Sequence, residues 1–482
     1  MLKNLKFYSV NSIFLSLLSL LSITILTKNL DLYNFGLIAL SILIGNIISG
    51  LLSLGLPLAT IRYYFESLNK DSASISLDGF KRLNFINLFF IFLIHVLFLI
   101  LLINFLDNVL ILLIFPSIDD ELILFAFFLG FVTKFYNYFT NLMIAEKNAY
   151  RYSIVTISFS IFSIITTILL FYFYSGTYIS RIYSLIFCYL SFTLILIVKL
   201  RENFKINFEI KYLIKSLKYC YPSIPETVIG LISDNFDKSF IAHIKSIGTL
   251  GIYDVSLRFS SFLKNLIDVI TKVWVPEFMN LAEKNDKVKI KSIYYCMVFY
   301  MSFLCLLVSY FSEEILIIFT SKTFYVAKYY IPLICLSILI NHMFSYLTRT
   351  QNSFSKEISK NLPGAIVYLI INVSFNIYAI NLFGIYGACA TLIISGFISS
   401  ILNFYLSNKT FYLNIKISIM LIRVIIIMLF LLPLYIIYFL QISLILGLLI
   451  KIILLILYIF IFFRKEYLEK TIMNRISNKF KI

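Results

Sequence analysis

The amino-acid sequence predicts an all-α polytopic membrane protein with about 14 transmembrane helices. Of its 482 residues, 61% are hydrophobic and 13% are charged, and the mean hydropathy is +0.94. Soluble domains are nearer half apolar and about a quarter charged. Apolar runs of about 20 residues, the length that crosses a bilayer, recur from one end of the chain to the other. These features together exclude an ordinary soluble protein.

Charged or turn residues divide the apolar runs into fourteen expected spans. In the first half of the chain they are 10–27 (between Lys6 and Lys28), 35–61 (Asp31 and Arg62), 83–105 (Arg82 and Asp107), 121–145 (Asp120 and Glu146), 152–174 (Arg151 and Gly176), 180–199 (Gly176 and Arg201) and 219–244 (Lys218 and Lys245). In the second half they are 251–275 (between Gly248 and Pro276), 292–320 (Lys291 and Lys322), 329–349 (Lys328 and Lys356), 361–382 (Lys360 and Gly384), 384–407 (Gly384 and Lys409), 417–438 (Lys416 and Gln441) and 443–463 (Gln441 and Arg464).

Two apolar runs need a separate interpretation. The first resembles a signal peptide, but no A-x-A-like cleavage site follows it, so we interpret it as an uncleaved first span. The run at 108–115 is too short to cross a bilayer, and we expect it in an external loop.

The distribution of basic residues predicts that both termini lie in the cytoplasm. With the N-terminus inside, 29 of the 41 lysines and arginines fall in inner segments, counting Lys199 and Arg349 at the inner ends of their spans, and five fall in outer loops, counting Arg181 at the outer end of its span. Short loops rich in lysine and arginine stay on the cytoplasmic side. The segment 106–121 has four acidic residues and no basic one, and it falls outside. The net charge of +17 therefore indicates topology, and nucleic acid is not expected as a partner.

A weak internal repeat predicts two lobes. The segments 32–40 and 247–255 are similar, with Gly36 and Gly251 at equivalent positions, and repeats meeting around a central site are common in transporters. The expected organisation is an N-terminal lobe of six spans at 1–200, a C-terminal lobe of six spans at 201–410, a helix pair at 411–463 and a basic cytoplasmic tail at 464–482.

No pattern in the sequence predicts an enzyme, a metal site or a cofactor. Walker A, GxSxG, HExxH and dinucleotide-binding patterns are missing, and the six cysteines and three histidines are isolated. Glu313 and Glu314 lie at the edge of an expected loop, where solvated charge is the expected role. Arg423 and Lys451 in the last two spans are interpreted as residues that snorkel towards the membrane interface.

The eighth expected span carries an unusual number of charged residues. On a helix, steps of four, three, four, three and four residues place one polar stripe down one face: Asp254, Arg258, Ser261, Asn265, Asp268 and Lys272. Lys264 lies off the stripe but can pair with Asp268 one turn later, and it is a further candidate for the substrate-binding cavity. Because a charge at the bilayer centre costs roughly 2.5–3.5 kcal/mol, we expect this face to line a hydrated interior.

Polar residues on other expected spans extend this prediction to a shared cavity. The fourth span has Lys134 and Asn137, and the seventh has Asp234, Asp237 and Lys238. The second and tenth spans show a similar alignment: Asn46, Gly50, Ser53 and Pro57, and Asn341, Ser345 and Thr348. Arg62, at the inner end of the second span, is a candidate for a cytoplasmic gate. Interhelical polar contacts also hold helices together, so a structural role is the alternative for each residue.

Three segments resemble the Wzx-type O-antigen flippases, a family of bacterial polysaccharide-unit flippases. Residues 27–64 resemble its first two helices through Thr27, Phe35-Gly36, Leu54-Gly55 and Arg62-Tyr63-Tyr64. Residues 221–278 resemble its seventh and eighth helices through Pro222, Asp237-Lys238, Gly251-Ile252-Tyr253, Trp274 and Pro276. Residues 383–395 resemble the beginning of its twelfth helix.

The resemblance implies the multidrug/oligosaccharidyl-lipid/polysaccharide exporter superfamily. Its members are expected to have two lobes around a central cavity that opens alternately to either side, without an ATPase. The implied substrate is an undecaprenyl-pyrophosphate-linked oligosaccharide, an O-antigen or capsule repeat unit, in the bacterial inner membrane. The polymerase and chain-length regulator of the pathway are implied as further partners. The alternatives are a drug/sodium antiporter or lipid II flippase of the same superfamily and, from the enzyme class, a membrane polysaccharide polymerase.

Overall fold

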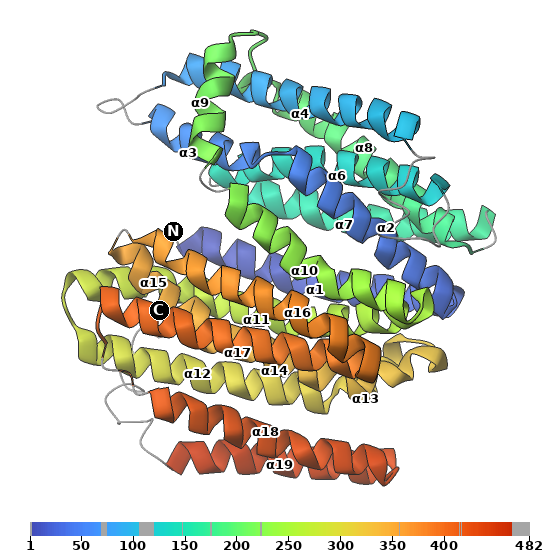
Figure 1. The fold of residues 1–482 in the computed structure, drawn as a ribbon, viewed down its shortest axis with the longest axis vertical. Coiled ribbons are helices and arrows are strands. Elements are labelled where there is room, and N and C mark those ends of the chain that lie inside the picture. The colour runs from blue at the N-terminus through green and yellow to red at the C-terminus, as the bar shows by residue number, and fades with distance from the viewer. Residues whose placement is uncertain are drawn as a thin grey trace. The chain divides into compact units, whose positions relative to one another are not determined.

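A computed structural model describes residues 2–68, 75–105, 120–146, 148–173, 176–221, 224–355, 357–413, 415 and 417–464. Within these residues the chain is built from helices and their connections, and no strand occurs (Figure 1). The short apolar run at 108–115 and nearly all of the basic tail lie outside the described residues. The predicted all-α fold is confirmed.

Most expected spans coincide with one continuous helix within a few residues. These helices are α1 (Leu2–Asn29), α4 (Leu77–Phe105), α6 (Asp120–Ala145), α7 (Ala149–Phe173), α8 (Tyr178–Lys199), α10 (Ile224–Ile244), α11 (Ile247–Glu283), α16 (Leu362–Phe383), α17 (Ile385–Thr410), α18 (Ile417–Phe439) and α19 (Leu444–Arg464). Several of their ends fall at the charged and turn residues that bounded the apolar runs, whereas α1 begins before Lys6, α4 begins before Arg82 and α11 continues past Pro276 to Glu283.

Twelve helical segments among the described residues are long and apolar enough to cross a membrane. The two helices α10 and α11 are also long enough, with 21 and 37 residues, but they are more polar. Every stretch of 18 residues in either helix contains at least three charged residues. The chain is therefore a multi-pass membrane protein, and the two helices richest in charge are those expected to line a cavity.

Three expected spans are interrupted where the backbone departs from the α-helix. The second divides into α2 (Leu32–Leu52) and α3 (Leu56–Leu68), because Leu54 and Gly55 between them have φ angles of 47° and 71°. The ninth divides into α12 (Lys287–Tyr310) and α13 (Ser312–Phe319). The tenth consists of α14 (Ile331–Ile340), a π-helix η4 (Asn341–Tyr346) and α15 (Leu347–Phe354). Apolar composition continues across each break, so periodicity did not reveal it.

The expected cytoplasmic loop at 200–218 contains structure of its own. It begins with the short 3-10 helix η1 (Arg201–Asn203) and ends with α9 (Ile210–Cys220). Leu213, Leu217 and Cys220 of α9 pack into a hydrophobic cluster with residues of α3 and α4. Two further 3-10 helices are η3 (Lys322–Tyr329) and η5 (Ile358–Asn361).

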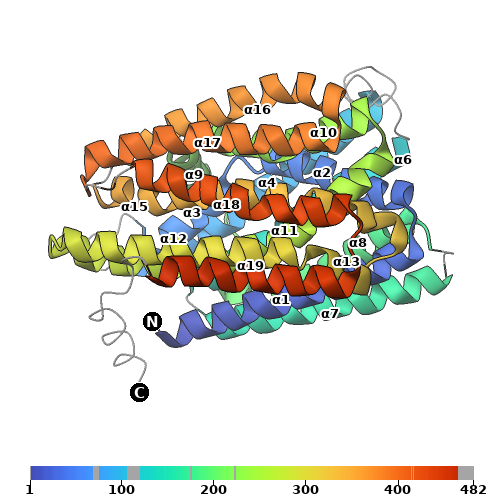
Figure 2. The same cartoon turned by 90° about the horizontal axis from the view of Figure 1, so that it is seen from below.

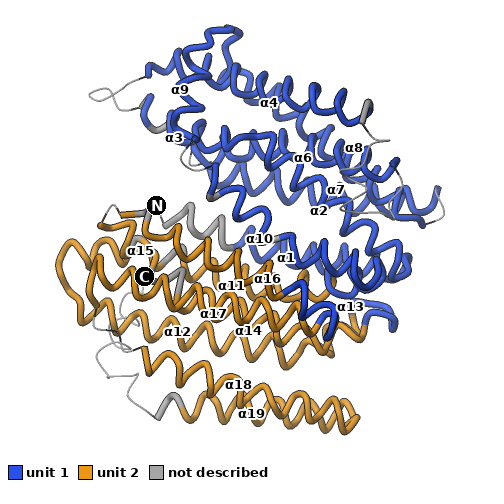
Figure 3. Tube along the Cα trace, in the orientation of Figure 1, with its two compact units in different colours: residues 1–254, 319–324, 376–385 blue, residues 255–318, 325–375, 386–482 orange. Residues whose placement is uncertain are grey.

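The contacts within the chain define two compact units (Figure 3). Unit 1 contains residues 1–254, 319–324 and 376–385, and unit 2 contains residues 255–318, 325–375 and 386–482. The unit boundary falls within α11, after Asp254. The two six-span lobes with limits at 200 and 410 stay a prediction.

In unit 1, α2 packs against α6 and α10, and α7 packs against α1 and α8. Glycines allow the closest approaches. A Cβ atom added to Gly130 of α6 would lie 2.2 Å from the carbonyl oxygen of Gly45 in α2. Gly36 and Gly251 also face each other, since a Cβ on Gly251 would lie 3.2 Å from the backbone nitrogen of Gly36. The two glycines that are equivalent in the sequence repeat thus share one contact between the first turns of α2 and α11.

In unit 2, α12 packs against α14 and also against the C-terminal helices α18 and α19. Figure 2 shows α12 and α19 lying side by side. The core contains large buried aromatic residues, among them Trp274, whose indole N–H donates to the Thr350 hydroxyl at 3.1 Å. Burial of such side chains stabilises the unit because each removes a large apolar area from its surroundings.

Candidate functional site

The first polar cluster lies where α10 turns into α11, in unit 1. The two helices meet at the turn around Lys245, so residues at similar distances from this turn face each other. The Tyr253 hydroxyl donates to the buried carboxylate of Asp237, which also accepts the backbone N–H of Lys238 at 2.8 Å. Lys238 Nζ lies 3.5 Å from Asp254 Oδ1. The structure thus brings together Asp237, Lys238 and Asp254, all predicted site residues.

Tyr253 was not predicted as a site residue, although it belongs to a segment that resembles the flippases. Its ring is fully buried, and its hydroxyl gives Asp237 a hydrogen-bond donor. A buried carboxylate requires such partners, because an uncompensated charge in an apolar interior is costly. The signal in the sequence was distance from the turn. Asp237-Lys238 and Tyr253-Asp254 are each seven to nine residues from Lys245, so antiparallel helices place the two pairs beside each other.

The second polar group is the stripe on α11 in unit 2. Its members Arg258, Ser261, Asn265 and Asp268 are half-buried. The opposite face of α11 is enclosed by protein. Its residues Val255, Phe259, Leu263 and Ile267 are buried. Lys264, off the stripe, is exposed. The backbone of Lys272 continues the helix, but its side chain lies outside the described residues.

The polar stripe contacts the π-helix η4 at one point. His342 Nε2 lies 3.5 Å from Asp268 Oδ1, and His342 Nδ1 lies 2.8 Å from the Ile338 carbonyl oxygen. The His342 side chain is 4% exposed and that of Asp268 is 38% exposed. The sequence had left His342 as an isolated histidine, and only the alignment of its neighbour Asn341 with other polar residues pointed to this position.

Three predicted site residues of unit 1 are not bonded to the first polar cluster. Lys134 is half-buried and Asn137 is exposed on α6, and Arg62 is exposed in the middle of α3. Within the described residues of unit 1, no hydrogen bond or ion pair joins any of them to Asp237, Lys238, Tyr253 or Asp254. A single cavity lined by all of the predicted residues therefore stays a prediction.

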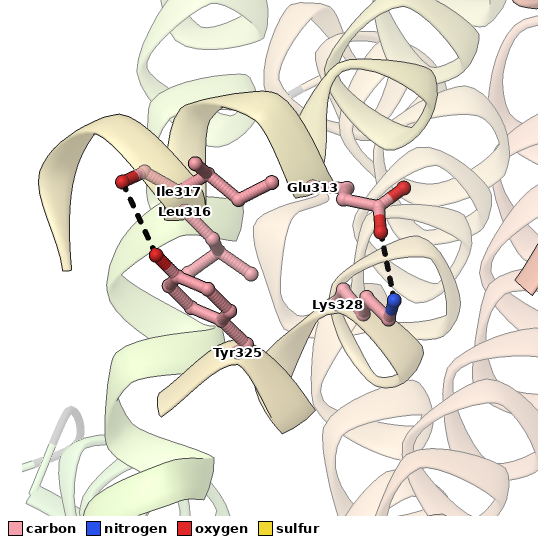
Figure 4. Close-up of a pocket in the computed structure, with 5 residues that line it drawn as sticks. All are labelled: Glu313, Leu316, Ile317, Tyr325 and Lys328. Carbon is pink, nitrogen blue, oxygen red and sulfur yellow. Dashed lines mark hydrogen bonds and ion pairs between the residues drawn. The ribbon is translucent and has the colours of Figure 1, made fainter. Parts of the chain in front are cut away.

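A small pocket lies in unit 2 (Figure 4). It is lined by Glu313, Leu316, Ile317, Tyr325 and Lys328 of α13 and η3. Lys328 Nζ lies 2.7 Å from Glu313 Oε1, and the Tyr325 hydroxyl donates to the Ile317 carbonyl oxygen at 3.5 Å. The cation that could bind an anionic ligand here is already paired with a carboxylate.

The same carboxylates also bind the C-terminal helix pair. Lys451 Nζ of α19 lies 2.7 Å from Glu314 Oε1 and 3.3 Å from Glu313 Oε2. The two glutamate side chains are 17% and 16% exposed, so the expectation that they are solvated loop charges is wrong. Two acids and two lysines balance each other in this cluster, which indicates a structural role.

The expectation that Arg423 and Lys451 snorkel to the interface is also wrong. Their exposed fractions are 4% and 1%. Arg423 Nη1 donates to the Tyr295 carbonyl oxygen at 3.3 Å, and its guanidinium lies 5.3 Å from the centre of the Tyr295 ring. Both cations bind partners from distant parts of the chain, and the apolar sequence around each gave no sign of them.

Among the described residues, no group of three or more His, Cys, Asp or Glu side chains could hold a metal ion. The polar groups on α10 and α11 combine cations, carboxylates, amides and hydroxyls. This combination suits a ligand with anionic and hydroxyl groups, because charge-assisted hydrogen bonds bind the first and neutral ones the second.

The first 282 residues match the family model described as "Polysaccharide biosynthesis protein". No curated protein matches the chain. This family match extends from the first residue through α10 and most of α11, and so includes most of the polar residues described above.

Several solved structures share the fold. A lipid II flippase MurJ in an inward closed conformation is 17% identical with a TM-score of 0.70, covering 95% of this chain and 98% of that chain. An inward-facing MATE family transporter of the MOP superfamily is 15% identical with a TM-score of 0.64, covering 82% and 94%. An outward-facing MATE family transporter of the MOP superfamily is 15% identical with a TM-score of 0.58, covering 84% and 95%. These similarities confirm the fold that the sequence resemblance implied.

Proposed function

Because the chain belongs to the polysaccharide biosynthesis protein family, we propose that it is a flippase for a lipid-linked sugar. Its substrate is an undecaprenyl-pyrophosphate-linked oligosaccharide, an O-antigen or capsule repeat unit. The protein moves this lipid from the cytoplasmic to the periplasmic leaflet of the bacterial inner membrane, and both of its termini lie in the cytoplasm.

The observation that carries this proposal is the half-buried polar stripe on α11. Arg258 is accessible enough to reach a ligand, whereas the opposite face of the helix is enclosed. A pyrophosphate that leaves water needs charged donors, and a guanidinium can bind two of its oxygens at once. Asn265 and Ser261 on the same face supply neutral partners for sugar hydroxyls.

Alternating access is the mechanism that fits this chemistry. Proteins that share the fold are described in inward-facing and outward-facing conformations. The sequence has no Walker A motif, so the driving force is an ion gradient, the membrane potential or removal of the product by the downstream polymerase. Each elementary charge that crosses 100 mV exchanges about 2.3 kcal/mol, which is enough to bias the cycle.

A second candidate substrate is lipid II. It is favoured by the similarity to the lipid II flippase structure, which covers 95% of this chain. The two substrates present different sugars, so a transport assay that offers each of them separately distinguishes the two functions.

The decisive experiment is reconstitution of the purified protein in liposomes without nucleotide. We expect lipid-linked oligosaccharide to reach the opposite leaflet faster than in empty liposomes, and faster than lipid II does. An Arg258→Ala variant should lose this activity and a Lys264→Ala variant, on the exposed side, should keep it. An absolute requirement for ATP in this minimal system contradicts the proposed mechanism.

The topology is tested independently of transport. Reporter fusions should place residues 62–82, 200–218 and 464–482 in the cytoplasm and residues 106–121 outside. A C-terminus on the outer side contradicts the assignment of both termini to the cytoplasm.

A further inference from the structure

We infer that the exposed side of α9 binds the headgroups of anionic phospholipids in the surrounding bilayer. α9 connects α8 to α10 and lies in unit 1. It carries a row of lysines beside a row of large apolar side chains, next to the end of α4 that begins with Lys81 and Arg82. The inference concerns the lipid around the protein, so it goes beyond the proposed function and does not depend on the transported substrate.

The spacing of residues divides the surface of α9 into three rows. On a helix, residues three and four positions apart share a face. One row is buried in the hydrophobic cluster with α3 and α4 described above. The apolar row on the exposed side contains Ile210 and Ile214, which are 65% and 52% exposed, and Tyr221 at the C-cap. The lysine row beside it consists of Lys211, Lys215 and Lys218. A helix with adjacent apolar and basic exposed rows is typical of one that lies in a membrane interface.

Contacts with α4 place the apolar row at the boundary of the bilayer. α4 is an apolar span, and large apolar side chains on one side of it are exposed at intervals from Phe89 to Ile103. Because a span of this length crosses the membrane, its exposed apolar side faces lipid. Phe208, two residues before α9, packs edge-on against Phe85 and Phe89, with ring centroids 5.3 and 5.1 Å apart. The lipid-facing surface of α4 therefore continues onto the segment that leads into α9.

The direction of α9 also fits a helix at the membrane interface. α9 crosses the first turns of α4 instead of running parallel to them (Figure 1). Two hydrogen bonds hold the preceding segment against α4. The Lys205 backbone N–H donates to the Lys81 carbonyl oxygen at 3.1 Å. Asn84 Nδ2 donates to the Asn203 carbonyl oxygen at 3.2 Å. A helix held across the end of a membrane span lies along the bilayer, where long lysine side chains reach the headgroups and apolar side chains enter the acyl region.

The charge of this surface favours an anionic headgroup over a zwitterionic one. Residues 77–82 and 199–221 contain eight lysines and arginines but only three carboxylates. Lys211 contacts Glu209, yet its side chain is 70% exposed. Lys218 is exposed, and within the part of the chain that the structure describes it forms no ion pair. Each lysine near an anionic bilayer surface strengthens the attraction about fivefold. The lysine row therefore suits a lipid with a net negative headgroup, such as phosphatidylglycerol.

Lipid selectivity tests the lysine row. The full-length protein is purified from bilayers with equal amounts of phosphatidylglycerol and phosphatidylcholine, and native mass spectrometry measures the lipids that remain bound. We expect the wild type to retain phosphatidylglycerol preferentially, and Lys211→Gln/Lys218→Gln to lower this preference several-fold. The matched control is Lys28→Gln/Lys322→Gln, which removes two exposed lysines from other parts of the chain and should behave as the wild type does. Equal preferences in the two double variants overturn the inference.

A tryptophan in the apolar row tests where the lipid binds. Trp274 is the one tryptophan of the chain and is buried, so Ile214→Trp adds an exposed fluorophore to a constant background. We expect phosphatidylglycerol with brominated acyl chains to quench this fluorophore several-fold more strongly than brominated phosphatidylcholine at the same mole fraction. The difference should disappear in about 1 M salt, which screens exposed charges, and when Lys211→Gln and Lys218→Gln are added.

Three results of the quenching experiment contradict the inference. Equal quenching by the two brominated lipids shows an apolar contact without a headgroup site. Protection of the fluorophore from both lipids and from acrylamide in the water identifies a protein surface as the occupant. Loss of phosphatidylglycerol quenching when lipid-linked oligosaccharide is added at a low mole fraction identifies the transported lipid as the ligand.

Discussion

The charged residues of α11 and those of the C-terminal helix pair represent two different uses of charge in a membrane protein. Lys451 of α19 is almost completely buried, and two carboxylates contact its ammonium group. On α11, Arg258 and Asp268 are half-buried, and Lys264 is exposed. The first arrangement is closed and balanced, whereas the second leaves charged groups accessible to a ligand.

This difference shows that the number of charges in a span does not indicate their role. The sequence has a single cation in each of the last two spans, which suggested snorkelling at the interface. In the structure the partners of Lys451 come from α13, more than a hundred residues away. A charge is structural where its partners enclose it, and it is a candidate for function where they do not. Four substitutions test this distinction, and we order them by their expected effect on stability.

The largest loss of stability is expected for Lys451→Met. The substitution leaves the carboxylate of Glu314 buried without its cation, and breaking a buried ion pair in this way costs about 3–5 kcal/mol. We expect a clearly lower melting temperature of the purified protein in detergent and less protein in the membrane.

The matched control for Lys451→Met is the double variant Lys451→Met/Glu314→Gln. Removing both charges eliminates the unpaired carboxylate, so most of the lost stability should return. If Lys451→Met alone melts at the temperature of the wild type, the ion pairs of Lys451 do not stabilise the fold. The distinction between enclosed structural charges and the accessible charges of α11 is then wrong.

A smaller loss is expected for Arg423→Met, in the other helix of the pair. This substitution removes a hydrogen bond to the Tyr295 carbonyl oxygen and a cation–π contact with the same residue. Methionine fills a similar volume, so the expected cost is about 1–3 kcal/mol, that of a lost buried hydrogen bond. Transport by the folded fraction should be normal. Loss of transport at normal stability places Arg423 in the functional group instead.

For Arg258→Ala we expect transport to be lost while the stability of the protein changes little. The side chain is half-buried on a face that is open to ligands, so the stability should change by about 1 kcal/mol or less. Export of the glycan should nevertheless be lost in a strain that depends on this protein, with membrane abundance near normal. Disappearance of the variant from the membrane identifies Arg258 as a structural residue and removes the main support for the proposed site.

The sequence predicted the helices well and their interruptions poorly. Apolar runs bounded by charges or turn residues predicted the ends of α6, α8 and α16 within about two residues, because a bilayer requires a minimum apolar length. The left-handed residues Leu54 and Gly55 and the π-helix η4 were missed, since hydropathy contains no information about backbone angles.

The candidate site was predicted in part, for a related reason. The stripe on α11 depends only on spacing along one helix, so the sequence placed Arg258, Asn265 and Asp268 on one half-buried face, and their role in binding stays a prediction. Contacts between helices are set by packing, which a single sequence does not show. Thus His342 was classed as isolated although its ring lies beside Asp268. The same limit applies to Tyr253, which donates to Asp237 across the turn.

The smallest effect is expected for the paired carboxylate of Glu209 between α4 and α9, where one of its partners, Lys211, is exposed to solvent. Glu209 binds Arg82 and Lys211, and the hydrogen bond from Lys211, with that from Arg82, holds the pKa of the Glu209 carboxyl below its usual range. A carboxyl whose pKa is lowered on folding contributes stability above its ordinary pKa, and this contribution is lost as the pH falls through the lowered value. Acidification from pH 6 to pH 3 should therefore lower the melting temperature of the wild type slightly more than that of Glu209→Gln. High salt should reduce the difference further, because exposed ion pairs are screened. Glu283→Gln, at an exposed position at the end of α11, is the control and should melt as the wild type does at each pH. A Glu209→Gln variant that is destabilised as strongly as Lys451→Met shows that exposure does not separate weak pairs from strong ones in this protein.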